Sequence, residues 1–81
     1  MSMVRIAVMV IGKGVLHVEM PADTSCGRAA DLVGEKAGAD LSKWEGTLKV
    51  VGGSLLDSET PIAEYAGKDL LLLQKRRAAN A

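Results

Sequence analysis

Hydrophobic residues along the chain follow two different spacings. A valine, isoleucine, leucine or methionine occupies every second position over residues 4–10, and again over residues 16–20 after a Gly-Lys-Gly step. This period of two predicts two strands, each with one apolar face. Because glycine reaches the positive φ values of a tight turn, Gly12 and Gly14 favour a hairpin, and Pro21 ends its second strand.

The spacing becomes helical after Pro21. Thr24 or Ser25 can cap the first turn of a helix, and Gly38 is a plausible stop. The apolar residues between them lie at helical intervals and are mostly small: Cys26, Ala29 or Ala30, Val33 and Ala37. Because this stripe is narrow, the helix depends on packing against a sheet.

The second half of the chain returns to strand patterns. We predict a third strand over residues 46–51 that ends at the Gly52-Gly53 pair, and a very short fourth strand or turn over residues 54–57. One helical turn follows, with Pro61 at its start, and residues 68–73 form the last strand. The predicted fold is α+β, a mixed sheet of four or five strands crossed by one helix, in the order ββαββ with a short helical turn.

The third strand contains one lysine, whose direction decides which residues face the core. If Leu48 and Val50 point inward, Lys49 faces solvent. The opposite register exposes Val50 and buries Lys49, which costs free energy unless the ammonium reaches water. We therefore favour the outward Lys49.

Four consecutive leucines dominate the last strand. A run without polar residues predicts a central strand, parallel to the first, with neighbours on both sides. Because side chains alternate, either Leu70 and Leu72 or Leu71 and Leu73 must face away from the helix. We place Leu71 and Leu73 on the outer side as an apolar strip for a partner, although singly exposed leucines are also ordinary.

Composition limits the class of protein. The chain has 81 residues, which is one domain, and its aromatic residues are Trp44 and Tyr65. Ten basic and ten acidic residues leave no net charge. Because proteins that bind nucleic acids or membrane surfaces usually carry a strong basic charge, we expect no nucleic-acid partner.

Basic charge is concentrated near the C-terminus. Lys75, Arg76 and Arg77 carry +3, so the other seven basic and ten acidic residues carry −3. We predict a folded domain over residues 1–74 and a flexible basic tail over residues 75–81. Three charges without interleaved aromatic residues favour a solubilising tail over a contact with an acidic partner or nucleic acid.

Compartment and membrane association follow from two simple observations. Cys26 is the single cysteine, so no internal disulfide can form, and a cytoplasmic location is the default expectation. The apolar run over residues 6–11 is far shorter than the ~20 residues of a membrane-spanning helix. Its alternation favours a strand over the apolar segment of a signal peptide.

Catalytic and metal-binding patterns are weak. His17 and Cys26 are the only residues of their kinds, and the predicted elements place them on opposite sides of the sheet. A Cys-His nucleophile is therefore not expected, and Cys26 is better interpreted as a small core residue. One histidine with scattered carboxylates has no metal-ligand spacing. We expect no catalytic residues, no metal and no cofactor, and predict that the protein is not an enzyme.

The segment "GGSLLDSETPIAEYAGKDLLLL" resembles the ubiquitin family and its β-grasp fold. In that family a glycine turn follows the third strand, then a leucine, a polar loop, a small helical turn with a tyrosine, and a final strand. The corresponding residues here are Gly53, Leu56, Asp57, Ile62, Tyr65 and Leu70. The glycine hairpin and the "ADTS" helix start also match. The resemblance implies that the Tyr65 hydroxyl bonds to loop backbone, while the alternative is that Tyr65 only covers the loop.

Two departures from the family bear on function. Conjugated members and sulfur carriers end in Gly-Gly, whereas this sequence ends in "QKRRAANA" and its Gly52-Gly53 pair is internal, where a turn explains it. In ubiquitin the recognition face is an exposed apolar patch built by the third strand, the last strand and the first hairpin loop. An outward Lys49 would make that patch partly polar here.

The resemblance and the residues together favour a non-catalytic interaction module or small accessory subunit. By analogy, its nearest counterparts are small bacterial β-grasp proteins without di-glycine that accompany type VII secretion systems or aromatic monooxygenases. The alternative is a covalent modifier or carrier whose C-terminus is processed or atypical. We expect a monomer that binds a larger protein. The tentative protein-binding residues are Lys49, Leu71, Leu73, His17 and Trp44, and Trp44 either caps the core or stands exposed as an anchor.

Overall fold

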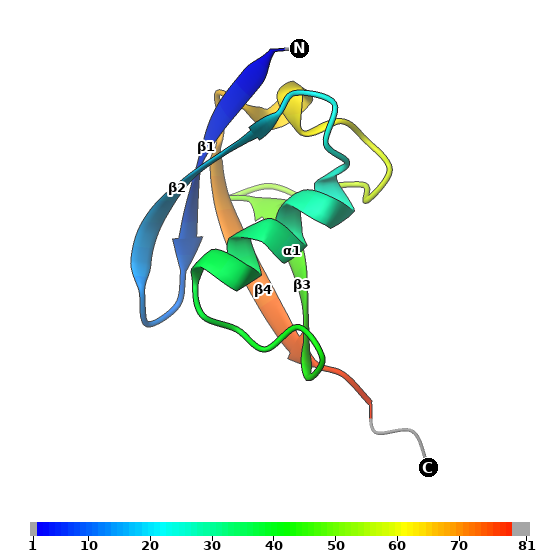
Figure 1. The fold of residues 1–81 in the computed structure, drawn as a ribbon. Coiled ribbons are helices and arrows are strands. Elements are labelled where there is room, and N and C mark those ends of the chain that lie inside the picture. The colour runs from blue at the N-terminus through cyan, green and yellow to red at the C-terminus, as the bar shows by residue number, and fades with distance from the viewer. Residues whose placement is uncertain (1, 79–81) are drawn as a thin grey trace.

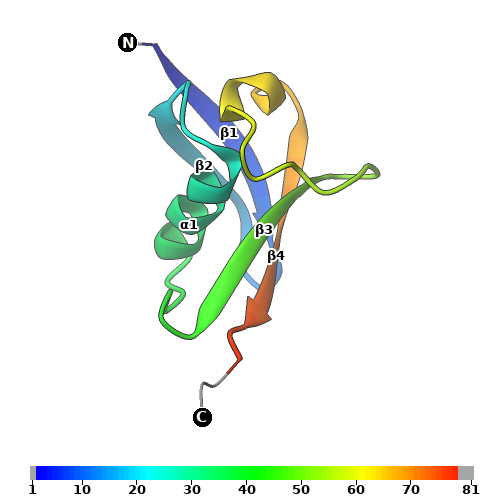
Figure 2. The ribbon, with the colours of Figure 1, turned by 90° about the vertical axis from the view of Figure 1, so that its right-hand side faces the viewer.

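A parallel pair of strands lies at the centre of the molecule. The computed structural model describes residues 2–78, and its sheet has the order β2-β1-β4-β3. Strand β1 pairs in parallel with β4, while β2 and β3 pair antiparallel at the two edges. Helix α1 crosses one face of the sheet (Figures 1 and 2). The elements are β1 (Met3–Val10), β2 (Gly14–Pro21), α1 (Cys26–Lys36), β3 (Trp44–Val50), the 3₁₀ turn η1 (Ile62–Tyr65) and β4 (Asp69–Arg76).

The N-terminal hairpin forms as its alternation predicts. β1 and β2 are in register from the Met3–Pro21 pair to the Val10–Gly14 pair. Gly12 and Gly14 have φ values of 84° and 82°, which side chains disfavour, and they let the chain reverse within three residues.

The helix begins and ends at the predicted positions. The Ser25 hydroxyl accepts a hydrogen bond from the Arg28 amide at 3.2 Å, and Gly38 follows the helix with a φ of 87°. Small side chains face the sheet, and Ala29, Ala30 and Val33 are fully or almost fully buried. This narrow stripe lets the helix axis approach the sheet closely.

The core lies between α1 and the two central strands. Leu70 and Leu72 of β4 pair with Val8 and Val10 of β1, and all four are at most 3% exposed. Because Leu70 and Leu72 face the helix, alternation sends the other two leucines of the run to the opposite face. The central, parallel position predicted for the leucine strand is therefore confirmed.

The structure selects one of two predicted alternatives and moves the predicted end of the last strand. Residues 54–57 form no strand and contribute one isolated bridge, Lys49 to Leu55, so the sheet has four strands. β4 runs to Arg76, past the boundary at Gln74, because Lys75 and Arg76 find partners in Glu45 and Trp44 of β3. Of the predicted tail, residues 79–81 lie outside the described part of the chain.

The closeness of α1 to the sheet gives a stability prediction at Gly46. A Cβ atom there would lie 2.9 Å from Leu72 Cδ1, and Leu72 is only 2% exposed and cannot move aside freely. We expect Gly46→Ala to lower the free energy of unfolding by about 1–3 kcal/mol in urea titrations.

Gly67→Ala is the matched control, because a Cβ at Gly67 meets no atom within 4 Å. Its free energy of unfolding should stay within about 0.5 kcal/mol of the parent value, or rise slightly. Equal effects of the two substitutions would contradict the close packing at Gly46.

Candidate docking surface

The side of the sheet opposite α1, called here the outer face, carries an apolar row across its strands. The registers place Val15, Met9, Leu71 and Lys49 side by side, one from each strand in the order β2-β1-β4-β3. Val15 is 53% exposed and Met9 47% exposed. Three neighbouring apolar side chains therefore face solvent, with an ammonium at one end of the row.

The rows on either side extend this surface. The row nearer the start of β4 contains His17, Ala7 and Asp69. The row nearer the end of β4 contains Leu73 and Thr47. Leu73 is 38% exposed and enlarges the apolar row on β4. The apolar centre is thus bordered by polar groups, an arrangement typical of protein-binding surfaces.

The small side chain of Ala7 leaves a hollow in the outer face. Larger neighbours surround it, with Met9 and Val15 on one side and Val51 and Asp69 on the other, and its volume is about 280 Å³. Such a depression can accept an apolar side chain of a partner, with the Asp69 carboxylate at its border. The outer face is therefore shaped as well as apolar.

No described helix covers the outer face. Figure 2 shows α1 and η1 on the other side of the sheet from it. Antiparallel sheets and mixed sheets usually expose polar side chains when one face meets water. Apolar residues at these positions are therefore not explained by the core of this chain.

The structure brings together most of the side chains predicted for docking. Lys49 and Leu71 are cross-strand partners, and Leu73 lies on the same face of β4. The outward direction of Lys49 is confirmed, since Leu48 is 1% exposed on the opposite face. His17 shares the outer face but lies on edge strand β2, at the border of the apolar centre.

Trp44 does not belong to this surface. The Trp44 side chain points to the same side of β3 as the buried Leu48. It therefore lies on the helix side of the sheet, near the end of the core. It is 36% exposed, and the Arg76 guanidinium lies over its ring.

Met9 and Val15 are the members of the surface that the sequence interpretation missed. Alternation already assigns them to the face away from the core, and both are apolar at positions where a solvated strand would be polar. That mismatch was the available signal. What the sequence lacked was the strand order, which places β1 between β2 and β4 and so joins the two residues to Leu71.

The three basic residues after Gln74 are held by the fold. Lys75 lies opposite Glu45, and the Arg76 guanidinium lies over the Trp44 ring, 5.9 Å from its centroid. Arg77 donates to the Leu41 carbonyl at 2.8 Å and approaches the Glu45 carboxylate at 3.5 Å. Their positions are thus set by β3 and the loop before it.

His17 and Cys26 lie on opposite sides of the sheet, as predicted. Cys26 is 2% exposed and belongs to the core. Burial raises the pKa of its thiol, and the nearby carboxylates of Asp57 and Glu64 raise this pKa further. Because the ordinary pKa of a thiol already lies above neutral, this raised pKa keeps the Cys26 thiol protonated at neutral pH.

Two other expectations concern metal binding and the hydrogen bond of the Tyr65 hydroxyl. Within residues 2–78, no three side chains of the metal-binding types gather at one point. Tyr65 packs half-buried against the core, but its hydroxyl takes part in none of the side-chain hydrogen bonds of the described residues. Among the described residues, the hydrogen bond implied by the resemblance is therefore not formed, and the Tyr65 side chain packs against the core cluster.

Comparisons with known proteins agree on the fold. No protein-family model and no curated protein sequence matches the chain. Its structure is similar to the N-terminal ubiquitin-like domain in the 4931431F19Rik protein, with a TM-score of 0.69, 8% identity, and coverage of 98% of this chain and 81% of that one. It is also similar to the C-terminal ubiquitin-like domain of mouse tubulin-specific chaperone e, with a TM-score of 0.58, 11% identity, and coverage of 98% and 93%.

A third similar structure is a much longer chain. In the MycP5-free ESX-5 inner membrane complex, the match has a TM-score of 0.61 and 18% identity, covering 98% of this chain but 22% of that one. These matches and the ββαββ order with its mixed four-stranded sheet define the fold, which is the ubiquitin-like β-grasp. Of the helices in residues 2–78, none has the length and apolar character needed to cross a membrane.

The burial of Cys26 predicts that its thiol reacts slowly with reagents in solution. In the native protein, modification by an aromatic disulfide reagent should be at least about 100-fold slower than in concentrated urea, because the reagent reaches the thiolate only after local unfolding. Stopped-flow absorbance measures both rates.

A variant that combines Cys26→Ala with Ala63→Cys serves as the control, since Ala63 is exposed on η1. Its thiol should react at nearly the same rate with and without urea. A native Cys26 that reacts as fast as this exposed thiol would show that the site is open to reagents.

Proposed function

We propose that this chain is a non-catalytic ubiquitin-like interaction module, a small accessory subunit or domain that docks against a larger protein through the outer face. The observation that supports this most is the uncovered row of Val15, Met9 and Leu71, extended by Leu73. An apolar row of this kind, hollowed at Ala7, is suited to bury a partner's side chains. His17, Lys49 and Asp69 would form the polar border.

The known ubiquitin-like structures support the same kind of role. Two similar structures are terminal ubiquitin-like domains of other proteins, and a third is part of a chain in an inner membrane complex. A ubiquitin-like fold that is joined to, or assembled with, larger proteins fits an accessory function. We also propose that the partner is a larger protein, that the free chain is a monomer, and that the protein is located in the cytoplasm.

The border charges would select among partners more than they would add affinity. Exposed ion pairs contribute little free energy because water screens them. Lys49 at one end of the apolar row and Asp69 beside the hollow would instead fix the orientation of the partner. The apolar side chains would supply most of the binding free energy.

Charge placed in the apolar row tests this proposal. We expect Met9→Glu and Leu73→Glu each to weaken partner binding by at least about tenfold, because a carboxylate would be buried against apolar groups. Affinity capture from the source cells with quantitative mass spectrometry identifies partners, and titration of a recovered partner measures the affinity.

The control is Ala63→Glu, which adds the same charge at an exposed position of η1, away from the outer face. It should retain every partner. Urea unfolding of all three variants checks that the fold is intact. Retention of the partners by both outer-face variants would refute docking through this face.

Mass spectrometry distinguishes a covalent modifier from the proposed non-covalent accessory module. A covalent modifier would produce conjugates larger by about the mass of the chain, or a form truncated near Gln74. Deleting residues 75–81 is a poor test, because Arg76 and Arg77 also contact Trp44, Leu41 and Glu45. Finding such conjugates would replace the accessory role with the modifier role.

A further inference from the structure

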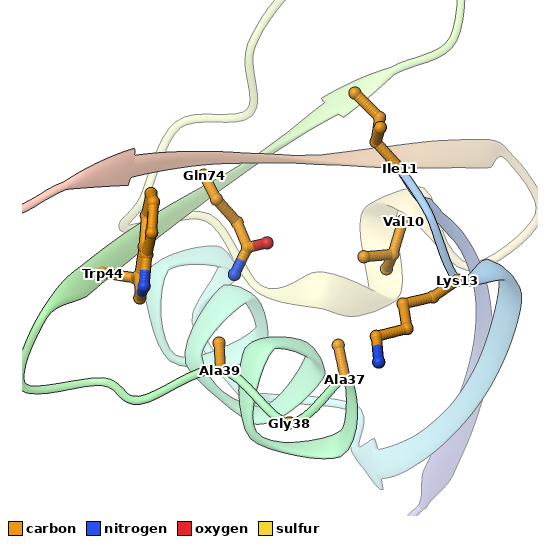
Figure 3. Close-up of a pocket in the computed structure, with 8 residues that line it drawn as sticks. All are labelled: Val10, Ile11, Lys13, Ala37, Gly38, Ala39, Trp44 and Gln74. Atoms are coloured by element: carbon orange, nitrogen blue, oxygen red, sulfur yellow. The ribbon is translucent and has the colours of Figure 1, made fainter.

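A second concave surface lies at the end of the molecule that contains the β1–β2 turn. This hairpin-end groove has a volume of about 240 Å³ and is lined by the turn, the segment that follows α1, Trp44 and Gln74 (Figure 3). It lies on the helix side of the sheet, so it is separate from the outer face. Its volume is several times the roughly 30 Å³ that one water molecule occupies in the liquid, and it can hold a branched aliphatic side chain.

The groove presents polar and apolar surface in similar amounts, with the Gln74 amide in its lining and the Lys13 ammonium at one border. Val10 forms part of its floor and is 3% exposed, and Ala37 and Ala39 lie along the helix side. In Figure 3, the Lys13 side chain extends from the turn toward Ala37, across the groove from Trp44. Lys13 is the single charged residue in the lining. An occupant would therefore contact aliphatic side chains of Val10, Ala37 and Ala39 together with an amide and an ammonium group.

The surroundings of the groove are also basic. Six of the ten basic residues of the chain lie at this end, against three acidic residues, a local net charge of +3; the six are Lys13, Lys36, Lys43, Lys75, Arg76 and Arg77, and the three are Glu35, Asp40 and Glu45. The remaining four basic and seven acidic residues give the rest of the chain a charge of −3.

Two of the three carboxylates at this end are already engaged. Asp40 accepts hydrogen bonds from the Ser42 hydroxyl at 2.7 Å and from the Ser42 amide at 3.0 Å, which hold the pKa of that carboxyl below its ordinary value. Glu45 lies 3.5 Å from the Arg77 guanidinium. Both carboxylates remain charged, so the local net charge of +3 already includes them and still favours an acidic ligand.

We propose that the hairpin-end groove binds a short acidic segment of a partner protein, with one leucine or isoleucine side chain inserted between Trp44 and the β1–β2 turn. Flanking Asp or Glu residues pair with Lys13 and Arg76. The apolar floor explains the aliphatic side chain, and the local charge explains its acidic neighbours.

A nucleic acid fits the groove less well. Trp44 is the only aromatic residue at this end, so successive bases would have no row of rings on which to stack. The basic residues around the groove are also interleaved with Glu35, Asp40 and Glu45, whose carboxylates would repel a phosphate chain. We therefore make nucleic-acid binding one of the outcomes that would overturn the proposal.

Trp44 provides a built-in reporter, because it is the single tryptophan of the chain. Its fluorescence can be titrated with three acetylated and amidated pentapeptides: Glu-Glu-Leu-Glu-Glu, the same peptide with a central alanine, and Lys-Lys-Leu-Lys-Lys. We expect saturable binding of the first peptide. The alanine and lysine peptides should bind at least about fivefold more weakly, since each lacks either the apolar contact or the charge attraction.

Charge reversal in the protein gives the matched comparison. Lys13→Glu should lower the affinity for the acidic leucine peptide by at least about fivefold. Lys68 is exposed in the loop before β4, and the affinity of the Lys68→Glu variant should stay within about twofold of the parent value. Both side chains are exposed, so both variants should fold. Raising the salt concentration should weaken the parent complex more than the complex of the Lys13→Glu variant, which retains Arg76.

Amide chemical shifts locate the peptide independently of fluorescence. The changes should be confined to residues 10–14, 37–39, 44 and 74–76. Changes centred on Met9 and Leu71, no saturable binding at millimolar peptide, equal binding of the lysine peptide, or tighter binding of single-stranded oligothymidylate would each overturn the proposal. The Met9→Glu variant should still bind the peptide, so failure at this groove and failure of outer-face docking are distinguishable.

Discussion

The parallel pairing of β1 with β4 is the contact on which the rest of the structure depends. It joins the first element of the chain to the last and places Leu70 and Leu72 beside Val8 and Val10, all nearly inaccessible to water. In a domain of this size, each such side chain contributes about 1.5–3 kcal/mol when fully buried. Because a parallel pair needs a long crossover connection, α1 and β3 must lie between these strands in the sequence.

The size of the side chains decides which face of this sheet is covered. Ala29, Ala30 and the absent side chain of Gly46 let α1 approach one face closely, and that face becomes the core. One helix cannot cover both faces, so the alternate residues of every strand remain outside. The core of this chain does not require apolar side chains on the outer face, and that observation underlies the proposed docking.

The local patterns predicted most of the elements, because each depends on neighbours in sequence. The period of two in the hairpin, the cap at Ser25 and the stop at Gly38 are local signals, and all three appear in the structure. The direction of Lys49 was also predictable, since burying an ammonium is costly. The end of β4 was not, because Arg76 and Arg77 are ordered by contacts with residues more than 30 positions away.

The sequence by itself determined the ubiquitin-like β-grasp fold, which side of each strand faces the core, and the absence of a plausible Cys-His pair. The strand faces and the separation of His17 from Cys26 follow from side-chain period and polarity, whereas the β-grasp fold was implied by the resemblance to the ubiquitin family. Only the tertiary structure decided that Val15, Met9 and Leu71 form one row, that Ala7 leaves a hollow, and that Trp44 borders a groove with Lys13. Surfaces of this kind are made where strands distant in sequence become neighbours, and residue spacing carries no record of that adjacency.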